Sequence, residues 1–252
     1  MKKYLHIGVL LVILGEGCSD NSLSWDLPRT NPIDSAQNQN PLDPKGPIAS
    51  FSTSSVSTVL NGTVNFLSTS TNTPNSFRWE FDGGTPSFSN EPSPSVLYNK
   101  IGKFDVKLTA LNPFGLDSIS KNDYINVYYH KSFSNNQWDG WRNNGWEFSG
   151  SRNCGDCIYA WQNLQKEPVH YIINKDFQLI PDGCDLSFYF NVYSPGGSLK
   201  VKVNEVEIWS TSGNGSGNPT IRLPSLSSFN LSFEAIIGET QSVYLNDIRI
   251  NP

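Results

Sequence analysis

Apolar and polar residues alternate along short segments of the first half of the chain. Every second residue is apolar in residues 77–81 and again in residues 104–110, and no stretch has the period of an amphipathic helix. A period of two gives a β-strand with one buried and one solvated face. Segments rich in Ser, Asn, Gly and Pro separate these runs and favour turns. The pattern predicts a sandwich of short strands, with Trp79 as the large central side chain of its core.

The second half of the chain also predicts strands. Residues 186–193 are almost continuously apolar, which indicates a strand buried on both faces. Residues 199–203 and 229–235 alternate instead, and Asn204 and Glu205 can form a two-residue hairpin turn between Val203 and Val206. We therefore expect a second sandwich, in which long loops join short strands.

The composition is that of an exported all-β protein. The 252 residues are 37% hydrophobic, which suffices for a core and excludes a wholly disordered chain. Only 16% are charged, against about 25% in typical globular domains. The net charge of −5 leaves no basic surface for phosphate groups, so we expect no nucleic-acid partner.

The N-terminus has the features of an export signal. Lys2 and Lys3 precede an apolar run from Leu5 to Leu14, which is too short to span a bilayer. With a glycine directly before Cys18, the segment resembles the signal of bacterial lipoproteins. This resemblance implies a signal peptide at residues 1–17 and acylation of Cys18. The alternative is a secretory signal that is cut nearby, with Cys18 as an ordinary thiol.

Residues 18–46 are rich in proline and polar side chains and predict a flexible tether. Together with an acylated Cys18, such a tether implies a protein that is lipid-anchored to the outer membrane or cell surface of a Gram-negative bacterium.

The first folded segment, residues 47–129, carries a family resemblance. It contains residues 79–86 (WEFDGGTP), residues 94–98 (PSVLY) and residues 102–110 (GKFDVKLTA). These runs resemble a PKD (polycystic kidney disease) domain. The resemblance implies an immunoglobulin-like β-sandwich, which serves as a spacer or contact module in bacterial surface proteins.

The second folded segment, residues 130–252, is similar in architecture to jelly-roll carbohydrate-binding modules and to galactose-binding-like adhesin domains. The similarity rests on an aromatic opening segment, an apolar central strand and the closing run VYLNDIRI at residues 243–250. In several such families a Glu near the first strand and an Asp near the last bind a structural calcium ion. Glu147 and Asp247 are the matching residues here, and no other cofactor is expected.

Aromatic and polar residues are densest at residues 138–146. Indole rings can stack on sugar rings, while amide and guanidinium groups can bond sugar hydroxyls. The alternative is that these tryptophans fill the core, and we expect at least one of Trp138, Trp141 and Trp161 to be exposed. The glycan-binding candidates are Trp138, Trp141, Trp146, Trp161, Arg142, Asn143 and Asn144.

Three cysteines, Cys154, Cys157 and Cys184, fall in the second segment. In an exported protein a disulfide is the default, and any two of the three can form it. A zinc site would need Cys184 and His170 in addition to the C-x-x-C pair, and we disfavour it.

The sequence favours binding over catalysis. His130 and His170 are the only histidines outside the signal segment, and no nucleophile elbow, zinc-protease helix or phosphate loop occurs. We expect a non-catalytic surface lipoprotein that binds extracellular polysaccharide through the jelly roll, with the PKD domain as a spacer. The alternative is an adhesive or structural protein that binds a surface protein complex without recognising glycans.

Overall fold

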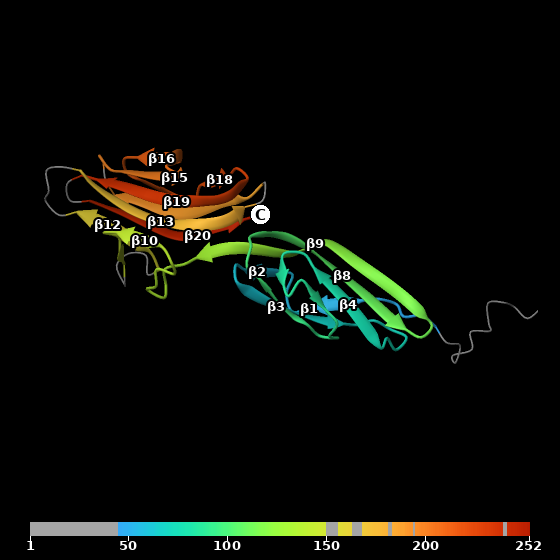
Figure 1. Cartoon of the computed structure of the whole chain (residues 1–252). Helices are drawn as coiled ribbons and strands as arrows, with labels where there is room; N and C mark the ends of the chain where they lie inside the picture. The colour runs from blue at the N-terminus through green and yellow to red at the C-terminus, as the bar shows by residue number, and fades with distance from the viewer. Residues whose placement is uncertain (1–44, 150–155, 163–167, 181–182, 194, 239–240) are drawn as a thin grey trace, which may run out of the picture. The chain divides into compact units, whose positions relative to one another are not determined.

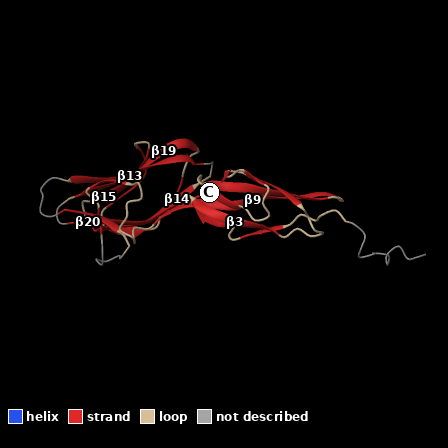
Figure 2. Cartoon of the chain, turned by 60° about the horizontal axis from the view of Figure 1, so that its bottom comes forward, coloured by secondary structure: helices blue, strands red, loops and turns tan. Residues whose placement is uncertain are grey.

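The computed structural model describes residues 45–149, 156–162, 168–180, 183–193, 195–238 and 241–252. These residues form strands and loops without a helix, which confirms the all-β class (Figure 2). Accordingly, no helix in the described part of the chain is long and apolar enough to cross a membrane. The predicted signal peptide, Cys18 and nearly all of the tether lie outside the described residues.

Two sheets form the first sandwich (Figure 1). Its strands are β1 (Phe51–Thr53), β2 (Ser57–Val59), β3 (Gly62–Ser68), β4 (Ser76–Phe81), β5 (Gly84–Thr85), β6 (Phe88–Ser89), β7 (Ser95–Tyr98), β8 (Gly102–Asn112) and β9 (Gly115–Lys131). One sheet has the order β1-β3-β7-β5, and the other contains β6-β4-β8-β9, with β2 parallel to β9. Trp79 is fully buried between them, as predicted, and its Nε1 donates to the Glu91 carbonyl at 2.8 Å.

The second sandwich is formed by a five-stranded sheet and by the part of an 11-stranded sheet that continues past β9, and most of its described buried side chains belong to one hydrophobic cluster. Its strands are β10 (Arg142–Asn144), β11 (Glu147–Phe148), β12 (Ile158–Gln162), β13 (Val169–Ile180), β14 (Asp185–Tyr193), β15 (Ser198–Val203), β16 (Val206–Ser212), β17 (Gly215–Gly217), β18 (Thr220–Arg222), β19 (Leu226–Ile237) and β20 (Gln241–Asn251). One sheet has the order β10-β13-β19-β15-β16, and the other contains β11-β12-β20-β14, with β17 and β18 paired to β14. This antiparallel arrangement is a sandwich of the jelly-roll type.

The strand β9 pairs in two places. Most of its length pairs with β8, whereas Tyr129–Lys131 pair with Ile248–Ile250 of β20. The strand therefore continues through the position between residues 129 and 130, where the second segment was predicted to begin.

The hairpin from β15 to β16 has the predicted turn. Val203 pairs with Val206, and Asn204 and Glu205 both have positive φ angles, as a two-residue hairpin turn of this kind requires.

The strand β14 is not buried on both faces, in contrast to the prediction from its apolar sequence. Its residues alternate between the core and the outer surface, so that Tyr189, Asn191 and Tyr193 point outward. The prediction failed because tyrosine counts as apolar in the pattern but tolerates a half-exposed position.

On the outer face of the β10-β13-β19-β15-β16 sheet, Glu234 is 8% exposed. Lys202 Nζ lies 2.6 Å from one of its carboxylate oxygens, and His170 Nδ1 lies 2.6 Å from the other. Burial raises the pKa of Glu234, but the bonds with Lys202 and His170 outweigh burial and hold this pKa below its usual 4.5. The ionised carboxylate therefore stabilises the fold above about pH 4.5, and this contribution is lost as the pH falls through the folded-state pKa.

Glu234→Gln is expected to lower the free energy of unfolding by about 1.5–3 kcal/mol at neutral pH, because it removes two charge-assisted hydrogen bonds. In acid the wild-type carboxylate is itself protonated, so the difference between the two proteins should shrink. Urea unfolding at neutral and acidic pH measures both values. Glu91→Gln, at an exposed position, is the matched control. A difference that stays the same in acid would contradict the assignment.

Candidate functional site

The aromatic segment, residues 138–146, enters the second core. Trp141 and Trp146 are 4% and 2% exposed, and both belong to the core cluster between the two sheets. Trp138 is half-buried, with its ring centroid 4.4 Å from that of Phe148. The prediction that Trp141 and Trp146 stack on a glycan is therefore wrong, because the protein interior already encloses both rings.

The polar candidates of this segment bond within the protein. Arg142 makes a two-pronged contact with Asp176, with nitrogen–oxygen distances of 2.7 and 3.1 Å. The Asn143 side chain donates to the Trp146 carbonyl and accepts from the Trp146 backbone N–H, each at 2.7 Å. Asn144 is exposed on β10. The structure does not bring these three residues together with Trp161, because β10 and β12 belong to different sheets.

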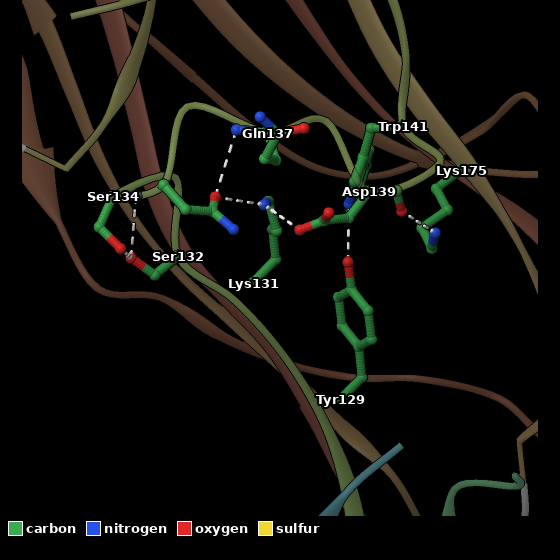
Figure 3. Close-up of polar contacts among 9 residues, drawn as sticks. Tyr129, Lys131, Ser132, Ser134, Gln137, Asp139, Trp141 and Lys175 are labelled. Atoms are coloured by element: carbon green, nitrogen blue, oxygen red, sulfur yellow. Dashed lines mark hydrogen bonds and ion pairs between the residues drawn. The ribbon is translucent and has the colours of Figure 1, made fainter. Parts of the chain in front are cut away.

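Two lysines hold the start of the aromatic segment (Figure 3). The buried Lys131 Nζ lies 2.5 Å from Asp139 Oδ2, and Lys175 Nζ donates to the Asp139 carbonyl at 2.5 Å. Burial lowers the pKa of Lys175, which Asp139 partly opposes. Trp141 Nε1 donates to the Tyr129 hydroxyl at 2.7 Å, and burial raises the pKa of that hydroxyl. These contacts fix the segment as a structural element.

Asp139→Asn is expected to lower the free energy of unfolding by about 1–2 kcal/mol, because it leaves the buried Lys131 ammonium without its counter-charge. This loss of unfolding free energy is smaller than the loss expected for a fully buried ion pair, because the Asp139 side chain is 55% exposed. Denaturant unfolding measures it. The double variant Lys131→Met with Asp139→Asn should recover most of the loss, since no unpaired charge then remains. A double variant as unstable as the sum of the two single variants would contradict this explanation.

Trp161 lies on the opposite sheet and is 44% exposed. It belongs to a group on the outer face of β12, β20 and β14 that we call the aromatic strip: Tyr159, Trp161, Tyr193 and Tyr244. The Tyr244 ring stacks on Tyr159 at 5.9 Å between centroids and meets the edge of Tyr193 at 5.8 Å. Tyr193 is 53% exposed. The strip therefore presents two open rings, Trp161 and Tyr193, beside a packed pair.

Neighbouring side chains hold the strip in place. The Tyr171 hydroxyl of β13 donates to the Trp161 carbonyl at 2.9 Å. Burial raises the pKa of Tyr171, and the negative charge of Glu147 raises it further, so this hydroxyl stays protonated as the donor. The Tyr159 hydroxyl donates to Glu147 Oε2 at 2.9 Å. These bonds fix the Tyr159 side chain and the backbone of Trp161.

Glu147 and Asp247, the calcium candidates, have separate partners. Glu147 accepts from Tyr159, whereas Asp247 Oδ1 lies 2.7 Å from His130 Nε2 and 3.0 Å from Arg249 Nε. Burial raises the pKa of Asp247, but the bonds with Arg249 and His130 outweigh it and lower the pKa overall. Within the described ranges no group of three or more His, Cys, Asp or Glu side chains is placed to hold a metal ion. The calcium site stays a prediction that the geometry does not strengthen.

The state of the cysteines rules out two of the three disulfide alternatives. Cys184 is a buried free thiol, and burial raises its pKa to about 11. Cys157 is disulfide-bonded. Both pairings that involved Cys184 are therefore wrong, because Cys157 is bonded to another cysteine while the Cys184 thiol stays free in the second core. Cys154 lies outside the described residues.

The sequence analysis missed three of the four residues of the strip. Tyr159, Tyr193 and Tyr244 each alternate with buried neighbours, as in the run Phe190, Asn191, Val192, Tyr193. A strict reading of period two would have placed these tyrosines on an outer face. It would not have placed them beside one another, because that depends on which strands pair.

Comparisons with known proteins give one family match and several similar structures. No curated protein shows significant sequence similarity to the chain. The chain is similar to the carbohydrate-binding module TmCBM61, solved with beta-1,4-galactotriose, at 14% identity and a TM-score of 0.40, covering 47% of this chain and 92% of that one. It is also similar to the K1 cleaved adhesin domain of Lys-gingipain from Porphyromonas gingivalis W83, at 13% identity and a TM-score of 0.41, covering 49% of this chain and 96% of that one.

The family match concerns the first sandwich. Its two sheets enclose Trp79, and the sequence from Ile48 to Asn122 matches the PKD domain family. Residues 48–122 are thus a PKD domain.

Proposed function

We propose that the second sandwich binds extracellular carbohydrate through the aromatic strip and carries out no catalysis. The observation that supports this most is the gathering of four aromatic side chains from three adjacent strands on one solvent-facing sheet surface, two of them about half exposed. Single exposed apolar side chains are common on protein surfaces, but a contiguous group of exposed aromatic rings is not. Such a group therefore favours a binding surface.

The chemistry of the strip suits sugars. The C–H faces of a sugar ring are apolar and stack on aromatic rings, whereas its hydroxyl groups need hydrogen-bond partners. The strip offers both, because Ser242 and Asn191 lie between and beside the rings and are half-buried rather than enclosed. Glu147 already holds the Tyr159 ring, and Tyr244 packs against Tyr159 and Tyr193, so binding would order few additional side chains and lose little entropy.

We further propose the setting in which this binding takes place. The signal-like N-terminus and Cys18 support export and lipid anchoring at the outer membrane or cell surface. In that setting the segment 18–46 would act as a tether, residues 47–129 as a PKD spacer and residues 130–252 as the binding domain. Labelled-palmitate incorporation that is lost in Cys18→Ala would test the anchor.

Trp161→Ala and Tyr193→Ala are each expected to weaken glycan binding about tenfold, which corresponds to about 1.4 kcal/mol per lost stacking surface. The full chain is screened by affinity gel electrophoresis against soluble glucans, galactans, mannans and xylans, and the variants are then compared on the polysaccharides that bind. Phe114→Ala is the matched control, because Phe114 is an equally exposed ring, at 59%, in the PKD domain.

The screen also addresses the alternative partner. Circular dichroism should show that both strip variants keep the wild-type fold, since their rings are half exposed. Glycan binding that ignores both substitutions, or no binding across the panel, would overturn the proposal. A protein complex captured equally by wild type and both strip variants would favour the adhesive alternative.

A further inference from the structure

The aromatic strip has a direction across the strands, which the register defines. Trp161 of β12 and Tyr193 of β14 both pair with Ser242 of β20, so one cross-strand row reads Trp161, Ser242, Tyr193. The next row reads Glu147, Tyr159, Tyr244, Asn191, Ser216. The two exposed rings therefore stand at the ends of one row, with a small hydroxyl side chain between them.

The spacing of these rings sets the size of the ligand. Two strand spacings separate Trp161 from Tyr193, which is about 10 Å. One sugar ring is comparable in width to a single strand spacing, so it can cover either ring but not both. A ligand that uses both rings must be a chain of several sugar units lying across the strands. Ser242 then faces the unit in the middle, where a hydroxyl group can bond it without blocking the chain.

The charge of the rows limits the class of polymer. Apart from Glu147 at the β11 end, the described residues of both rows carry aromatic, hydroxyl or amide side chains and include no lysine or arginine. Arg249 and Arg222, which lie elsewhere on this sheet, are paired with Asp247 and Asp185. The chain as a whole carries a net charge of −5. An anionic polymer would meet no free counter-charge in these rows and would be repelled.

We propose that the aromatic strip binds an uncharged polysaccharide whose chain runs across the strands from Trp161 to Tyr193. This rests on the proposed function, and it adds the charge class, the minimum length and the direction of the ligand.

Calorimetric titration with a length series tests the proposal. The probes are neutral oligosaccharides from the monosaccharide to the hexasaccharide, taken from the polysaccharide that binds best. Affinity should rise at least about tenfold up to the length that reaches both rings and then level off. In Trp161→Ala and in Tyr193→Ala this rise should be absent, so that long and short oligosaccharides bind alike. Phe114→Ala should keep the full rise.

Charge is tested separately with polygalacturonate as the acidic probe at low salt, where it should bind at least about tenfold more weakly than the neutral polymer. A monosaccharide that binds as well as the hexasaccharide, or polygalacturonate that binds better than neutral polymers, would overturn this inference while the strip variants still lose binding. Failure of all glycans, or indifference to both strip substitutions, would overturn the proposed function together with the inference.

Discussion

Trp146→Ala is expected to lower the free energy of unfolding by about 3–5 kcal/mol, because it empties a tryptophan-sized volume in the second core. The Trp146 side chain is 2% exposed and lies among the largest fully buried side chains. The Asn143 side chain donates to the Trp146 carbonyl and accepts from the Trp146 N–H, so the backbone is held and cannot easily collapse into the cavity. Urea unfolding of the full chain, followed by circular dichroism, measures the change.

Two phenylalanine variants separate packing from polar effects in this core. Trp146 Nε1 has no hydrogen-bond partner in the described structure, so Trp146→Phe removes a buried donor that was already unsatisfied. Trp141→Phe instead removes the bond to the buried Tyr129 hydroxyl and should cost about 1–3 kcal/mol more than the packing change alone. Trp146→Phe as costly as Trp146→Ala, or Trp141→Phe no worse than Trp146→Phe, would contradict this account.

Trp161→Ala is expected to have the opposite profile to Trp146→Ala, with a small effect on stability and a large effect on glycan binding. Trp161→Ala removes a ring that is 44% exposed and should change the free energy of unfolding by about 0.5 kcal/mol or less. The same substitution is expected to weaken glycan binding. Trp146 and Trp161 are both tryptophans of the second sandwich, but we expect the first to matter for stability and propose that the second contacts the ligand.

Much of the architecture could be predicted because it depends on neighbours along the chain. Burial in β8 and β15 alternates with the period of two that the sequence shows, and the Asn204-Glu205 turn joins the strands that it was expected to join. Such features follow from local geometry alone, since successive side chains of a strand point to opposite faces. The PKD domain was recognisable for the same reason, because its motifs are contiguous.

The candidate site was predicted less well because it depends on residues that are far apart in the sequence and adjacent only in the fold. The density of indoles at residues 138–146 suggested a surface platform, but β10 in this segment pairs with β13 at one side of a sheet, and the core encloses Trp141 and Trp146 on either side of β10. The strip, in contrast, unites residues from β12, β14 and β20, which are far apart in sequence, and only the pairing register places Tyr244 between Tyr159 and Tyr193.

The polar candidates show a further limit of sequence patterns. Arg142 and Asn143 carry hydrogen-bonding groups that suit sugar hydroxyls. In the structure, however, these groups already bond Asp176 and the Trp146 backbone. Glu147, predicted as a calcium ligand, accepts a bond that orients Tyr159 in the strip. A residue type indicates which bonds a side chain can make, whereas the fold decides whether those bonds remain available to a ligand.

Trp79→Ala is expected to lower the free energy of unfolding of the PKD domain by about 3–5 kcal/mol, a large share of the 5–15 kcal/mol of a typical domain. The Trp79 ring lies 5.3 Å from Phe51, 5.8 Å from Phe66 and 5.6 Å from Phe81, so its removal breaks one aromatic cluster that both sheets share. The bond from Nε1 to the Glu91 carbonyl is lost as well, although Glu91 is exposed and water can replace the donor.

Phe114→Ala in the same domain provides the control for Trp79→Ala. Phe114 is a ring of similar chemistry but 59% exposed, so its loss should change stability by about 0.5 kcal/mol or less. Chemical denaturation of both variants, read by near-ultraviolet circular dichroism, compares a central ring with a peripheral one. A Trp79→Ala variant within about 1 kcal/mol of wild type would mean that the three phenylalanines close the gap, and that the core does not depend on the indole.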